Sequence, residues 1–129
     1  MERKSLPFKI TGAYEGFAET EGLLRLDNTN ITLQFQTVDA VFGMMKSAIK
    51  NISISIDELE TIEFRKRFWG NHIFMHISRL DLAQALPSQS SNQIKLKIAR
   101  GDRTLAEDMV RAIRLQQSEY EYDQALKAS

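Results

Sequence analysis

Apolar and polar side chains alternate with a period of two through most of the stretch from residue 22 to residue 99. Such alternation is typical of β-strands with one buried and one exposed face, because successive side chains of a strand point to opposite faces. Ile is the commonest residue on the apolar side, which suits a half-buried pleated surface. The pattern predicts six strands, in residues 24–27, 31–36, 52–57, 62–65, 73–77 and 94–98, and the apolar residues of segment 8–19 predict a seventh strand before them.

Short turn signals separate most of these segments, for example at residues 27–30, 57–58 and 69–71. Short connections join antiparallel neighbours, whereas parallel strands need long crossovers. The first segment is less regular than the others, and its Gly12 and Gly16 predict a bent or bulged strand. We therefore expect an antiparallel sheet.

The period changes to that of a helix after Thr104. The apolar positions Leu105, Ala106, Met109, Val110, Ala112 and Ile113 form one helical stripe, from which Leu115 departs. Thr104 and Glu107 fit a capping box and favour Thr104 as the N-cap, with Asp102 as the alternative. Residues 119–129 either extend this helix or form a flexible tail.

Seven antiparallel strands followed by one amphipathic helix must close or stack to bury their apolar faces. The sequence therefore predicts a mainly β fold, a barrel or sandwich capped by one C-terminal α-helix, in a single domain over residues 1–118. Two segments interrupt the strands. Residues 38–48 are rich in Met and Phe, and residues 79–92 begin with two potential helical turns that Pro87 ends.

Four segments carry a resemblance to a known family: Glu21–Leu26, Phe68–Gly70, Ile94–Arg100 and Asp102–Thr104. In these segments the chain resembles small stand-alone bacterial proteins with a pleckstrin-homology (PH)-like domain. The resemblance covers roughly residues 8–118, and it implies a PH-like barrel that acts as a binding or scaffolding module.

The resemblance does not extend to phosphoinositide binding. Members that bind these lipids carry several Lys and Arg residues around the first hairpin, whereas this chain has Glu15, Glu19 and Glu21 there. Its only Trp is Trp69, whereas many members have a Trp in the final helix. We therefore expect no phosphoinositide ligand.

The chain has 17 basic and 17 acidic side chains and a formal net charge of zero. This balance argues against a general nucleic-acid coat protein, which needs an excess of Lys and Arg. Residues 61–103 nevertheless carry eight basic and three acidic side chains. This basic middle third is either a surface that faces an anionic partner or a solvated face paired with the acidic flanks.

The sequence shows no catalytic, metal or cofactor motif. It contains no Cys and no Gly-rich phosphate loop, and its Ser, Asp and His residues have no catalytic spacing. His72 and His76 are expected on one face of a strand, too far apart to share a metal ion. The N-terminal residues have no apolar signal region, and no run approaches a membrane span, so we expect a cytoplasmic protein.

Three basic residues precede two aromatic residues at the predicted turn around residue 68. Phe68 and Trp69 either contact a protein partner, insert into an anionic membrane surface, or pack over the barrel edge. Strand alternation predicts that Lys66 faces away from Arg65 and Arg67. An anion-binding surface would then consist of Arg65 and Arg67, joined by Lys95 and Lys97 from another strand.

The segment around Gly43 supplies a second candidate surface. Phe42, Met44 and Met45 either form an exposed patch for self-association, as a symmetric homodimer, or fill one end of the barrel. The function expected from the sequence is a non-enzymatic binding or scaffolding module for a protein partner. The alternatives are a peripheral membrane module on anionic lipid and a small-molecule carrier with its site in the barrel mouth.

Overall fold

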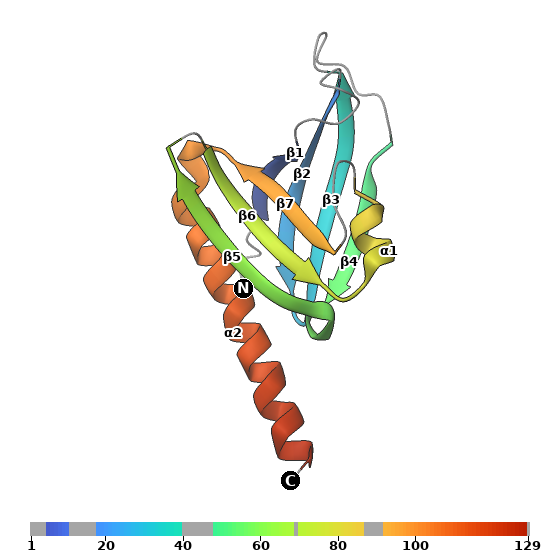
Figure 1. Cartoon of the computed structure of the whole chain (residues 1–129), viewed down its shortest axis with the longest axis vertical. Helices are drawn as coiled ribbons and strands as arrows, with labels where there is room; N and C mark the ends of the chain where they lie inside the picture. Colours follow the sequence, from blue (N-terminus) through green and yellow to red (C-terminus); the bar gives the residue numbers. More distant parts are fainter. Residues whose placement is uncertain (1–4, 11–17, 40–47, 69, 87–91, 129) are drawn as a thin grey trace.

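A computed structural model describes residues 5–10, 18–39, 48–68, 70–86 and 92–128 (Figure 1). Within these residues there are seven strands: β1 (Ser5–Ile10), β2 (Ala18–Asp27), β3 (Asn30–Asp39), β4 (Lys50–Ser55), β5 (Leu59–Arg67), β6 (Gly70–Ile77) and β7 (Gln93–Ile98). The helices are α1 (Leu80–Gln84) and α2 (Arg103–Ala128), and two short 3₁₀ helices are η2 (Ile56–Glu58) and η3 (Arg100–Asp102).

The seven strands form one antiparallel sheet in the order β4-β3-β2-β1-β7-β6-β5. The mainly β fold with a C-terminal helix is therefore confirmed. In Figure 1, β2 and β3 run steeply, whereas β5 to β7 cross the view diagonally, so the sheet is strongly twisted. Among the described strands, β4 and β5 are the two edges of the sheet. These strands therefore do not form a closed barrel.

The two halves of the sheet meet at β1, which pairs with β2 over its whole length and with β7 at Lys9 and Lys97. The expectation that residues 8–19 form one strand was wrong, because β1 ends at Ile10 and residues 18 and 19 already belong to β2. Gly12 and Gly16 lie outside the described residues. The apolar positions of β1, Leu6, Phe8 and Ile10, alternate with exposed ones and enter the core.

The core lies between the concave face of the sheet and the first half of α2. The alternating residues of all seven strands are buried there, and α2 contributes Ala106, Met109, Val110 and Ile113. This stripe is the predicted one, and Leu115 is 60% exposed, as its departure from the stripe predicted. The helix period of the sequence therefore identified the buried face of α2.

Helix α2 begins earlier and ends later than the apolar stripe. The capping-box prediction at Thr104 was wrong, because the chain already turns in η3 and continues into α2 at Arg103. The backbone N–H of Asp102 donates to the carbonyl of Ala99 at 3.0 Å, so Thr104 lies inside continuous helix. At the other end α2 reaches Ala128, so residues 119–128 extend the helix.

Side chains of α2 satisfy the open edge of β5. Nε and Nη2 of Arg114 donate to the carbonyl oxygen of Ile62 at 3.1 and 2.8 Å. Nε2 of Gln117 donates to the carbonyls of Leu59 and Glu60 at 2.9 and 3.2 Å. An edge strand otherwise presents unpaired backbone groups, so these bonds close this edge and fix the position of α2.

The connection between the sheet halves contains the capping contact that the sequence pattern did not identify. The backbone N–H of Ser55 donates to Oε1 of Glu58 at 3.0 Å, and Oε2 of Glu58 accepts from Nη1 of Arg79 at 2.9 Å. Arg79 also binds Asp81 at the start of α1, the helix expected at the beginning of residues 79–92. None of the helices described is long and apolar enough to cross a membrane.

Candidate binding face

The outer face of β5, β6 and β7 gathers four of the eight basic side chains of residues 61–103. Arg65 lies directly across from His72, and His72 lies directly across from Lys97. Arg67 follows Arg65 on the same face of β5, and Lys95 precedes Lys97 on the same face of β7. We call this set the basic face: Arg65, Arg67, His72, Phe74, Lys95 and Lys97.

Phe74 is the aromatic centre of the basic face. Cζ of Arg65 lies 4.5 Å from the centroid of the Phe74 ring, and Nζ of Lys95 lies 5.8 Å from it. The His72 ring lies 6.0 Å from the Phe74 ring. Arg65 also forms an ion pair with Glu63 on the same strand. A half-buried ring under two cations offers apolar contact and positive charge together.

Lys66 lies on the opposite side of the sheet from the basic face, as strand alternation predicted. Its Nζ is 2.8 Å from Oε1 of Glu107 on α2, and this ion pair holds the pKa of Glu107 below its ordinary value. The contact also shows on which side α2 lies. The helix covers the inner side of β5, and the basic face points away from it.

The environment of His72 disfavours a further positive charge. Burial lowers the pKa of His72 below its ordinary value of 6.5, and Lys95, Lys97 and Arg67 lower it further by repulsion. The neutral ring is therefore the form that the folded protein holds near neutral pH. A bound carboxylate would offset the same repulsion.

The shifted pKa of His72 predicts a pH dependence of stability. Between its folded pKa and 6.5, the unfolded chain binds more protons than the folded one, so the free energy of unfolding rises with pH across this window. Urea denaturation from about pH 5 to about pH 7 should show this slope. His72→Gln should flatten it, whereas His76→Gln should retain it; an unchanged slope in His72→Gln would contradict the assignment.

The remaining predicted contact residues divide into two groups. Phe68, between β5 and β6, is 91% exposed, so of the three alternatives for this turn, packing over the sheet edge does not hold for Phe68. Trp69 lies outside the described residues, and so do Phe42, Met44 and Met45. Their proposed contacts stay predictions.

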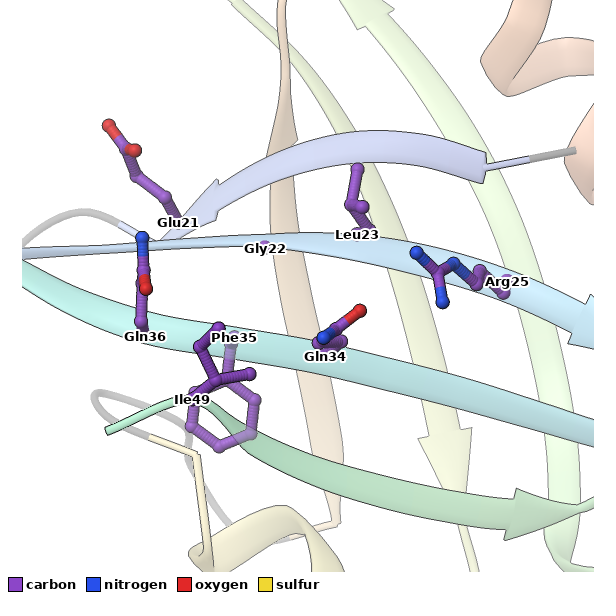
Figure 2. A pocket seen from close by; sticks show the side chains of 8 residues that line it. All are labelled: Glu21, Gly22, Leu23, Arg25, Gln34, Phe35, Gln36 and Ile49. Atoms are coloured by element: carbon purple, nitrogen blue, oxygen red, sulfur yellow. The ribbon is translucent and has the colours of Figure 1, made fainter. Parts of the chain in front are cut away.

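A hollow of about 440 Å³ lies on the outer face of β2 and β3, away from the basic face. Figure 2 shows its lining side chains, among them Glu21, Arg25, Gln34 and Gln36. Nε of Arg25 donates to Oγ of Ser5 at 3.1 Å. The hollow carries one charge of each sign, so the basic face has the stronger electrostatic character. The carrier hypothesis placed its site in a barrel mouth, which the open order of the described strands does not form.

His72 and His76 occupy the outer face of β6, as predicted for strand histidines. Nδ1 of His76 lies 3.0 Å from Oγ1 of Thr61, and within the described residues no group of three or more His, Asp or Glu side chains is arranged to hold a metal ion. The sequence interpretation did not assign His72 and Phe74 to the basic face. The alternation of residues 72–76 could have identified them, because His72 and Phe74 alternate with the buried residues and therefore point outward.

Comparisons of the chain with protein-family models, with curated proteins and with solved structures find no match. The chemistry of the basic face therefore has to be judged from its own geometry.

Proposed function

We propose that this protein is a cytoplasmic, non-enzymatic binding module of the PH-like type, and that its basic face binds an acidic segment of a protein partner. The observation that carries the proposal is the cluster of four exposed cations around the half-buried Phe74. Arg and aromatic side chains are enriched where protein contacts are strongest. The open antiparallel sheet with one C-terminal helix supports the PH-like assignment.

The charge distribution around the basic face favours an acidic partner over a neutral one. Three of its cations contribute to the lowered pKa of His72, so they repel one another as well as that ring. Next to them on the sheet, Lys9 is compensated by Glu19 and Glu21, with Nζ–O distances of 3.9 and 3.7 Å. On the outer face of β5 to β7, Arg65, Arg67, Lys95 and Lys97 outnumber the carboxylate of Glu63. This net positive charge should speed the approach of an acidic segment.

Replacing two cations of the basic face tests this function. Arg65→Ser with Arg67→Ser should weaken binding of a labelled oligoglutamate peptide about tenfold, which is a loss of about 1.4 kcal/mol. It should also flatten the salt dependence measured by fluorescence anisotropy. Stability should change little, by roughly 0.5 kcal/mol for each exposed substitution.

The matched control is Arg103→Ser with Arg111→Ser, which removes the same charge from exposed positions of α2. An equal loss in the control, or unchanged binding in the Arg65/Arg67 variant, would contradict the proposal. A second experiment measures binding of the protein to anionic and to neutral vesicles by sedimentation. Binding to anionic vesicles with none to the peptide would replace the protein partner by a membrane surface.

A further inference from the structure

The last turns of α2 extend beyond the sheet. Ile113 is the last fully buried residue of the helix, and Tyr120 is the last that packs against the core. Every residue from Glu121 to Ala128 is exposed, and Figure 1 shows the end of α2 running past all the strands. Most of the stability of a helix in a protein comes from tertiary packing, which these exposed turns lack. The segment therefore gains stability from any surface that covers it.

This extension has its own apolar stripe. Leu115, Tyr122 and Leu126 are 60%, 66% and 55% exposed. Their spacings of seven and four residues place them on one face of the helix, opposite to the stripe that contains Ile113. The core-facing side of α2 is satisfied by the sheet, so this outer stripe is available to a second surface.

Acidic residues lie beside the stripe. Glu119 lies one turn after Leu115, and Asp123 lies one turn before Leu126, so both carboxylates flank the same side of the stripe. Lys127 is the only cation that follows Arg114 in the sequence, so these carboxylates have little positive charge near them on the helix. A basic surface would offset their negative charge, and it would also offset the partial negative charge at the C-terminal end of the helix.

The basic face has the complementary properties. It combines the Phe74 ring with positive charges, and Lys95 and Lys97 are exposed two residues apart on one strand, about 6.6 Å. Glu119 and Asp123 are about 6 Å apart on the helix. The ion pair of Lys66 with Glu107 places α2 on the side of the sheet opposite to the basic face. The extension therefore reaches the basic face of another molecule and not its own.

We propose that residues 115–128 of α2 bind the basic face of a second copy of this chain. The inference rests on the proposed function, since it names the acidic partner of the same face. Leu115, Tyr122 and Leu126 cover Phe74 and the apolar stems of the lysines, while Glu119 and Asp123 pair with Lys95 and Lys97. Reciprocal exchange of the two helices closes a symmetric dimer.

Two charge-reversed variants and their mixture test this arrangement by light scattering. Lys95→Glu with Lys97→Glu reverses the basic face, and Glu119→Lys with Asp123→Lys reverses the helix. Each variant alone opposes like charges, so we expect the monomer mass of 14.8 kDa at concentrations where the unaltered chain has twice that mass. An equimolar mixture restores opposite charges at both contacts, so the dimer should return, and it should weaken at high salt.

The control variant Asp57→Lys with Glu60→Lys changes the net charge as the helix reversal does, at exposed positions outside both surfaces, and should leave the dimer intact. Melting temperatures show whether each variant is folded. If a double variant does not fold, the single substitution Lys97→Glu or Asp123→Lys is used in its place.

A monomeric unaltered chain, or a mixture of the two variants that stays monomeric, overturns the inference. So does a dimer that survives reversal of the basic face, which would indicate helix–helix pairing. If the unaltered chain is monomeric but its basic face binds oligoglutamate, the proposed function stands and only the dimer fails.

Discussion

Ile113→Asp should lower the free energy of unfolding by about 4 kcal/mol or more and leave much of the protein unfolded. Ile113 is fully buried, on the stripe with which α2 covers the sheet. A carboxylate there is either an unpaired charge or a protonated acid in an apolar site, and the lost side chain also leaves a cavity. Urea denaturation followed by circular dichroism measures the loss.

Two further substitutions keep this prediction testable when Ile113→Asp does not fold. Ile113→Val removes one methyl group and should cost about 1 kcal/mol. Leu115→Asp introduces the same carboxylate two residues later on the exposed side of the helix, and at low protein concentration it should change stability by only about 0.5 kcal/mol. Equal losses at residues 113 and 115 would mean that the buried stripe of α2 is assigned to the wrong face.

Gly22→Val should be nearly as damaging, with a loss of about 3 kcal/mol. Gly22 in β2 lies between Phe8 of β1 and Phe35 of β3. A Cβ atom at this position would overlap the carbonyl oxygen of Gln34 and lie 2.6 Å from Cζ of Phe8. The Phe8 ring occupies the space of the missing side chain, so any substitution must displace either the ring or the backbone of β3.

Gly101→Ala is the matched control for Gly22. A Cβ atom added at Gly101 meets nothing within 4 Å, so this change should be neutral or stabilise by roughly 0.5 kcal/mol through the unfolded chain. The two substitutions are compared by chemical denaturation under the same conditions. A Gly22→Val protein as stable as Gly101→Ala would show that β1 and β2 can separate without cost.

The alternation of the sequence after residue 22 predicted which side of each strand is buried. Lys66 points away from Arg65 because successive side chains of a strand alternate, and its contact with Glu107 agrees. The same local rule, with the helical period, placed Ile113 inside and Leu115 outside. These predictions succeed because each depends only on neighbouring residues.

Local signals were weaker at the ends of elements. The Thr104–Glu107 spacing fits a capping box as well as Ser55–Glu58 does, but only the second is used, at Ser55 N–H to Glu58. Whether a helix begins at Thr104 depends on the preceding 3₁₀ turn, which ties Asp102 to Ala99. A capping residue allows a helix to begin at its position, but the path of the preceding chain decides whether the helix begins there.

The sequence by itself determined six of the seven strands and their faces through the period of two, and the core stripe of α2 through the helical period, since side-chain direction follows from backbone geometry at each residue. Strand order depended on the tertiary structure. Only the pairing of β7 with both β1 and β6 brings Lys95 and Lys97 to the face that holds Arg65 and Phe74. Residues from β5 and β7 are about 30 positions apart, and no local period carries information on which strands become neighbours. Which strands become neighbours depends on burying the inner faces of all seven strands together with α2. The resulting strand order brings the residues of the basic face together.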